Sequence, residues 1–209
     1  MRPSGRDFPL QPHFGVNRIA TWSPSVTTTI TTEGMPITSV GTVSHPTLAA
    51  TNLAASMRRW RPTSAAVVDS VADQRSQGWA CWRGNAAGLG GWTFVTRVSL
   101  TTLQATGMGF FGLYGSTAAL ATTLTLAAVV NCIGIGFQRG THSNWQLVRN
   151  DGTGAPTLTD MGASFAIATG GVLTLFIAAP PNGSSVWVRV IDEVTGAVFE
   201  QEVTADLPA

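Results

Sequence analysis

The sequence predicts an all-β fold: a jelly-roll-like β-sandwich with an extended, proline-rich N-terminal arm and one short helix. Short apolar segments recur at near-regular intervals between residues 79 and 203, and clusters of turn residues separate them. Such spacing is typical of sandwiches and barrels. The segments are Trp79–Arg83, Trp92–Leu100, Met108–Tyr114, Asn131–Phe137, Trp145–Arg149, Val172–Ala178, Ser185–Ile191 and Ala197–Val203. The clearest turn clusters are Gly88–Gly91, Asn150–Gly152, Pro180–Gly183 and Asp192–Gly196.

Residues 1–50 form the expected arm. They hold six of the eleven prolines, which remove backbone donors and disfavour pairing inside a sheet. The arm also contains Phe8, Phe14 and Trp22, so it is too apolar for a free tail. We therefore expect these side chains to dock, either on a partner in a larger assembly or on the arm's own domain.

Residues 51–78 are expected to hold a short helix and a linker. Apolar residues in Thr51–Trp60 follow a helical spacing, and Thr51 or Asn52 could cap the helix. Pro62 should stop it. For Ser64–Asp73 the pattern fits a helical turn and a strand equally well.

Residues 79–209 form the expected sandwich domain. Trp92–Ser99 alternates between bulky and polar residues, which predicts a strand with one wet face. Ser185–Ile191 carries bulk on both faces and should be a central strand. In Asn131–Phe137, Cys132, Gly134 and Gly136 share one small face, which predicts close approach of a second sheet or of another subunit.

Composition limits the classes of function. Charged residues make up 11% of the 209 residues, and all twelve basic residues are arginine. A net charge of +1 offers no basic field for nucleic acid. Weakly charged surfaces promote association, so we expect a homo-oligomer or a subunit of a larger assembly.

No targeting or membrane segment is expected. The first ten residues hold no apolar run, and glycines and threonines interrupt the weakly charged stretch 113–137. We therefore expect a protein made in a reducing cytoplasm.

Groups able to perform catalysis are sparse. Cys81 and Cys132 lie in apolar segments without metal-ligand spacing, so both are expected to be small buried residues, and no cofactor or metal is expected. The histidines are scattered along the chain. Glu200 and Glu202 share one strand face; they could serve a glycosidase or simply form the polar face of an edge strand.

The tryptophans offer a candidate glycan site. Trp145 stands between Asn144 and Gln146, and Trp79 and Trp82 lie near other polar residues. Aromatic rings beside amides could stack on sugars. The alternative is that these rings fill the core or a subunit interface.

Several segments together resemble a family of bacteriophage tail and tail-fibre-type virion proteins that carry a lectin-like β-sandwich. They occur in order over most of the chain: Asp7–Gly15, Ala50–Arg59, Gly88–Arg97, Asn131–Gly136, Asn144–Gly152 and Leu173–Gly183. None is a catalytic motif.

The resemblance implies a non-enzymatic structural subunit of the virion, assembled in the host cytoplasm. It also implies a trimer that contacts other virion proteins, with host glycan binding as an additional role. Family members often continue beyond the position of Leu207, so a function housed in such an extension is not expected here. A capsid-decorating (cement or head-fibre) protein and a polysaccharide depolymerase using Glu200 and Glu202 remain the alternatives.

Overall fold

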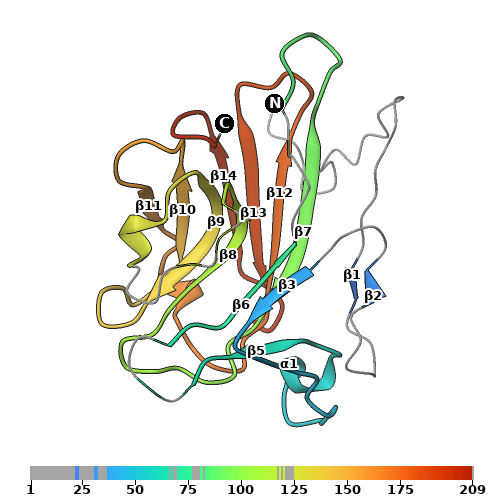
Figure 1. Cartoon of the computed structure of the whole chain (residues 1–209), viewed down its shortest axis with the longest axis vertical. Helices are drawn as coiled ribbons and strands as arrows, with labels where there is room; N and C mark the ends of the chain where they lie inside the picture. Colours follow the sequence, from blue (N-terminus) through green and yellow to red (C-terminus); the bar gives the residue numbers. More distant parts are fainter. Residues whose placement is uncertain are drawn as a thin grey trace.

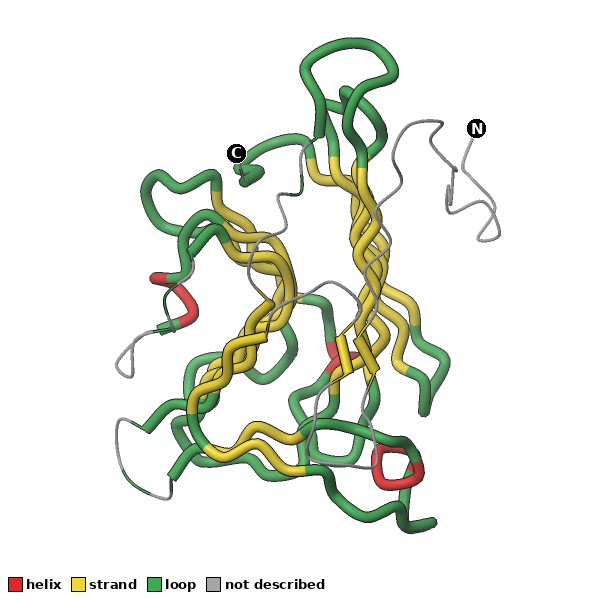
Figure 2. The backbone as a smooth tube through the Cα atoms, turned by 45° about the vertical axis from the view of Figure 1, so that its right-hand side comes forward, coloured by secondary structure: helices red, strands yellow, loops and turns green. Residues whose placement is uncertain are grey.

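Two four-stranded antiparallel sheets face each other (Figures 1 and 2). The structure is a computed structural model that describes residues 22–23, 31–32, 37–65, 67, 70–76, 81, 83–116, 118, 120 and 125–208. The first sheet has the order β14-β13-β12-β7 and contains β7 (Trp92–Val98), β12 (Leu173–Ala179), β13 (Val186–Asp192) and β14 (Val198–Val203). The second has the order β11-β10-β9-β8 and contains β8 (Met108–Tyr114), β9 (Cys132–Gln138), β10 (Gln146–Asn150) and β11 (Thr157–Asp160).

The prediction of an all-β sandwich is confirmed. The second sheet is a simple meander inserted between β7 and β12, so a long connection returns the chain to the first sheet. This strand order differs from the two interlocked Greek keys of a jelly roll. β13 is central, as expected, and the Asn150–Gly152 and Asp192–Gly196 turns join neighbouring antiparallel strands.

Seven of the eight expected strand segments are strands in the structure. The eighth, Trp79–Arg83, falls mostly outside the described residues, and its described members Cys81 and Arg83 are not in a strand. β11 was not expected, because Thr157–Asp160 has the sequence Thr-Leu-Thr-Asp and offers a single apolar residue. It becomes a strand by pairing with β10, in the register Leu147 opposite Thr159.

The main core lies between the sheets. Alternate residues of each strand point into it, including Ile133 and Ile135 from β9, Leu175 and Ile177 from β12, and Val188 from β13. All five are at most 1% exposed. The period-2 alternation read from the sequence therefore places one face of each sheet in this core.

A second, smaller cluster covers the other face of β8–β11. Leu126 and Val129, from a segment that includes the short helix η1 (Leu126–Ala128), pack with Cys132 and Val148. All four side chains have no exposed surface. The small face of Asn131–Phe137 is therefore covered by the chain's own segment, and the expectation of a second sheet or another subunit there is wrong.

Residues 37–76 form two short ladders and one helical turn. β3 (Ile37–Val40) pairs with β6 (Asp73–Ser76), and β4 (Thr42–Ser44) pairs with β5 (Arg61–Thr63). Gly41 joins β3 to β4 with a φ of +80°, and a side chain there would meet the Thr63 carbonyl. The expectation that residues 1–50 do not pair is thus wrong for 37–44. Two further short strands, β1 (Trp22–Ser23) and β2 (Thr31–Thr32), also pair.

The expected helix is shorter than its pattern. α1 spans Leu53–Ser56, and Asn52 caps it by accepting a hydrogen bond from the Ala55 N–H at 2.8 Å, which confirms one of the two expected caps. Met57 is already extended. The Arg59 guanidinium donates to the carbonyl oxygens of Ala55 and Met57, so it satisfies C-terminal acceptors of a helix that has ended. A second short 3-10 helix, η2 (Ala163–Phe165), precedes β12.

Candidate functional site

The sheet β14-β13-β12-β7 has one side in the core and one side turned away from the second sheet (Figure 2). We call the latter the outer face. By strand alternation it consists of Thr93, Val95, Arg97, Thr174, Phe176, Ala178, Trp187, Arg189, Ile191, Val198, Glu200 and Glu202. Val95 and Val198, on its two edge strands, are 49% and 48% exposed. On the central strand β12, Thr174 and Ala178 are only 2% and 4% exposed, so the exposed apolar side chains of this face lie at its two edges.

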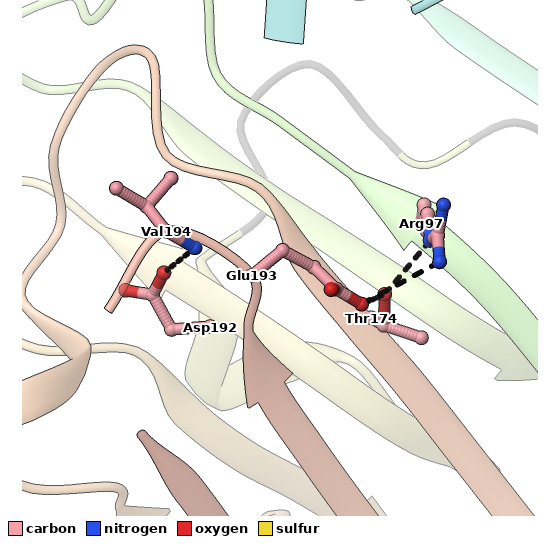
Figure 3. Close-up of polar contacts among 5 residues, drawn as sticks. All are labelled: Arg97, Thr174, Asp192, Glu193 and Val194. Atoms are coloured by element: carbon pink, nitrogen blue, oxygen red, sulfur yellow. Dashed lines mark hydrogen bonds and ion pairs between the residues drawn. The ribbon is translucent and has the colours of Figure 1, made fainter. Parts of the chain in front are cut away.

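A polar network closes one end of this face (Figure 3). The Arg97 Nε donates to Thr174 Oγ1 at 3.0 Å, and the Thr174 hydroxyl donates to the Glu193 carboxylate. Arg97 also lies 3.6 Å from Glu193 as an ion pair. Thr174 is only 2% exposed, so the network satisfies a hydroxyl that would otherwise be buried alone. The neighbouring Asp192 carboxylate accepts from the Val194 N–H at 2.8 Å and holds the β13–β14 turn.

Glu200 and Glu202 lie on the outer face of β14, which is an edge strand. Arg189 Nε is 3.2 Å from the Glu200 carboxylate, and the Glu200 side chain is 53% exposed. Glu202 lies opposite Trp187. This is an open, solvated arrangement that resists further edge pairing.

Asn144 and Gln146 converge on Asp160, at the end of β11. The Asn144 Nδ2 donates to one carboxylate oxygen at 3.0 Å, and the Gln146 Nε2 donates to the other at 3.2 Å. The Gly162 N–H donates at 2.6 Å and, together with the two amides, holds the pKa of Asp160 below its ordinary value. Asp160 thus engages one amide N–H from each of the two side chains proposed for sugar recognition. Sequence reasoning missed it because β11 was not expected.

Trp145 is a core side chain. Its ring centroid lies 5.2 Å from that of Phe137 and 5.9 Å from that of Phe111, and the residue is 4% exposed. The glycan-stacking role for Trp145 is therefore corrected, because no ring face is open to a sugar. The core alternative is the one that the structure shows.

A small hollow lies beside this tryptophan. It has a volume of about 60 Å³ and is lined mainly by apolar residues, among them Leu100, Phe165 and Leu173. Pockets that enclose small-molecule ligands measure roughly 300–1,000 Å³, so the hollow is too small for a sugar ring.

The remaining expected site residues lie beyond what the structure describes. Trp79, Trp82, Phe8 and Phe14 are outside the described residues, and of Trp22 only the backbone, in β1, is described. They stay predictions.

The two cysteines differ from each other. Cys132 is buried, and burial together with the Asp206 carboxylate raises the pKa of its thiol to about 12. Cys81 is exposed, so the expectation that both are buried is wrong for this residue. Over the described ranges, no three histidine, cysteine or acidic side chains gather closely enough to hold a metal ion. None of the helices in the described part of the chain is long and apolar enough to cross a membrane.

Comparison of the chain with protein-family models, with curated proteins and with solved structures found no match.

Proposed function

We propose that this protein is a non-enzymatic structural subunit of a bacteriophage virion, a homotrimer that forms part of a tail appendage. The observation that supports an assembly role is the make-up of residues 37–76. Their described part contains two ladders and a capped helical turn, yet Ala54 is its single buried residue.

Two-stranded ladders without a hydrophobic face are marginally stable in water. The sandwich does not bury all the apolar side chains of this region. Leu48, Leu53 and Val67 are 51%, 38% and 67% exposed. If a neighbouring subunit buried those side chains, it would stabilise the folded region by about 25 cal/mol per Å² of apolar surface removed from water.

One approach between this region and the sandwich lies at Gly170. A side chain on Gly170 would come within 3.4 Å of the Asn52 amide, so the cap of α1 abuts the turn before β12. This contact orients residues 37–76 at one end of the sandwich, opposite the Gly84–Gly91 loop (Figure 1). One end is thus suited to attachment, while the loops at the other end are free to face outward.

The virion assignment itself is supported by the family resemblance of several segments that occur in the same order along the chain. A tail appendage and a capsid-decorating protein would use the same attachment region. Glycan binding, if present, has to rely on residues other than Trp145, such as Trp79 and Trp82.

Light scattering on the purified chain tests the oligomer. We expect three times the chain mass of 21.8 kDa at micromolar concentration. Leu48→Asp with Leu53→Asp should dissociate it, whereas Leu89→Asp should not. Leu89 is the matched control because it is 48% exposed and belongs to the Gly84–Gly91 loop. A monomeric wild type would contradict the proposal.

Imaging of the particle decides placement. Density at the tail supports the appendage, and density on the capsid lattice supports decoration. Incubation with host polysaccharide should release no reducing ends; release that is abolished by Glu200→Gln would establish a depolymerase instead.

A further inference from the structure

β8 is an edge strand of the second sheet. Over the part of the chain that the structure describes, its backbone hydrogen bonds go to β9 alone, and β8 ends the order β11-β10-β9-β8. We propose that this edge pairs with β8 of a second copy of the chain, antiparallel and about a twofold axis at Phe111. The inference goes beyond the proposed function and does not rest on it.

The backbone of β8 is open to solvent at its two glycines. A glycine has no side chain, so any exposure of the residue is exposure of the main chain. Gly109 and Gly112 are both partly exposed, as are the other five residues of β8. On the neighbouring β9, Gly134 and Gly136 are buried. Unpaired N–H and C=O groups at such an edge are a ready template for another strand.

The sequence of β8 lacks the features that protect an edge. Natural edge strands commonly carry charged side chains or proline. The other three edges of the two large sheets carry charges, with Arg97 on β7, Asp160 on β11 and Glu200 on β14. β8 has the sequence Met-Gly-Phe-Phe-Gly-Leu-Tyr, without a charge or a proline. It is therefore the edge best suited to accept a strand.

The order of large and small residues in β8 is complementary to itself. When two copies run antiparallel with Phe111 opposite Phe111, Gly109 of each copy faces Leu113 of the other. Gly112 then faces Phe110. Each glycine thus has a bulky side chain across from it, and such cross-strand pairs stabilise sheets and support edge glycines. This is also the register in which all seven residues find a partner.

The ladder between β8 and β9 already uses this kind of pairing. Gly109 lies opposite Phe137, and Phe110 lies opposite Gly136. A side chain on Gly109 would come within 2.5 Å of the Phe137 ring, so the ring occupies the space that the glycine leaves. The strand therefore forms within one chain the pairs that we infer between two chains.

Both sides of the sheet would continue across the twofold axis. Directly opposite residues of an antiparallel pair lie on the same face. Phe111 and Leu113 are partly buried against the main core, whereas Met108, Phe110 and Tyr114 are partly buried against the smaller cluster around Leu126. Pairing of β8 with its copy would cover the exposed remainder of these five side chains.

A twofold contact at β8 is compatible with the proposed trimer. The trimer would use residues 37–76, and twofold contacts can join whole trimers in dihedral symmetry. One strand per copy is a small contact beside the roughly 1,600 Å² of a stable interface. We therefore expect it to form between neighbouring trimers at high local concentration, whereas the trimer remains the largest species at micromolar concentration.

Disulfide cross-linking at submillimolar concentration, with diamide as oxidant, tests the pairing. Phe111→Cys in a Cys81→Ser background places two thiols across the axis. Opposite residues have Cα atoms about 4.5–5.5 Å apart, which a disulfide spans. Leu113→Cys is the matched control on the same side of β8, because its two copies would lie about 14 Å apart along the strands. We expect disulfide-linked dimer to form about tenfold faster from Phe111→Cys than from Leu113→Cys.

A second pair guards against loss of folding, because the Phe111 ring lies 5.9 Å from that of Trp145 in the core. Met108→Cys and Tyr114→Cys on separate copies should cross-link with each other and not with themselves. Adding Leu48→Asp with Leu53→Asp should leave both results unchanged, so loss of the trimer and loss of this contact are distinguishable. The proposal is overturned if neither the Phe111 thiols nor the mixed pair cross-links faster than Leu113→Cys.

Discussion

The Leu126 side chain occupies the space that a side chain on Gly136 would need: a methyl group on Gly136 would overlap the Cδ1 of Leu126. Leu126 has no exposed surface, and it can lie flat on β9 only because the strand has no side chain at that point. This contact completes the smaller hydrophobic cluster on the other face of β8–β11, and it explains why β9 has a glycine at position 136.

Gly134→Ala should destabilise the protein more than Gly136→Ala. At Gly134 the added methyl would lie 2.3 Å from the Phe111 backbone carbonyl oxygen, which cannot move aside. At Gly136 the nearest atom is the end of the Leu126 side chain, and the nearest backbone atom, the Gly109 carbonyl oxygen, is 3.0 Å away. We expect costs at the upper and lower ends of about 1–3 kcal/mol for overpacking. Urea unfolding of both variants measures which substitution lowers the free energy of unfolding more. Adding Leu126→Ala to Gly136→Ala should cost less than the two single changes summed, and strict additivity would argue against the shared volume.

Cys132 should be unreactive in the native protein. Its thiol is fully buried, and its pKa is raised to about 12, mainly by burial and further by the Asp206 carboxylate. At pH 8 almost no thiolate forms, and the thiolate is the reacting species. A maleimide titration should modify Cys81 alone in the folded chain and both thiols in denaturant. Rapid modification of Cys132 under native conditions would show that the second core opens readily.

Asp160→Asn should destabilise the protein at pH 7 but much less in acid. The folded pKa of Asp160 is lowered by the Gly162 N–H and by the Asn144 and Gln146 amides, so its carboxylate stabilises the fold at neutral pH. That contribution is complete above the unfolded pKa of about 4 and is lost as the pH falls through the lower folded pKa. Urea midpoints of wild type and variant, measured from pH 7 to pH 2, should converge in acid. A gap of constant size would mean that the charge is unimportant.

Trp145→Ala should strongly lower the free energy of unfolding of the protein. Removing a buried tryptophan typically costs about 3–5 kcal/mol, whereas Asn144→Ala removes one exposed hydrogen bond and should cost less than about 1 kcal/mol. Denaturant unfolding compares the two. Similar small losses in both variants would mean that the ring is not an integral part of the core.

Much of the sandwich followed from local pattern. The alternation in Trp92–Ser99 identified the core-facing side of β7, and the bulk on both faces of Ser185–Ile191 identified β13 as central. The same alternation could also have predicted that Trp145 does not join a site with its neighbours. Because successive strand residues point to opposite sides, Trp145 could not share a surface with both Asn144 and Gln146.

What the sequence by itself determined is seven of the eight strands of the two large sheets, several turns between them and the core-facing side of β7, because a two-residue period depends only on neighbouring residues. Tertiary structure alone decided what covers each face. Leu126 fills the space above Gly136, and Asp160 joins Asn144 and Gln146 after β11 pairs with β10. Such contacts join residues at least ten positions apart, and their free energy arises only when separate segments pack together.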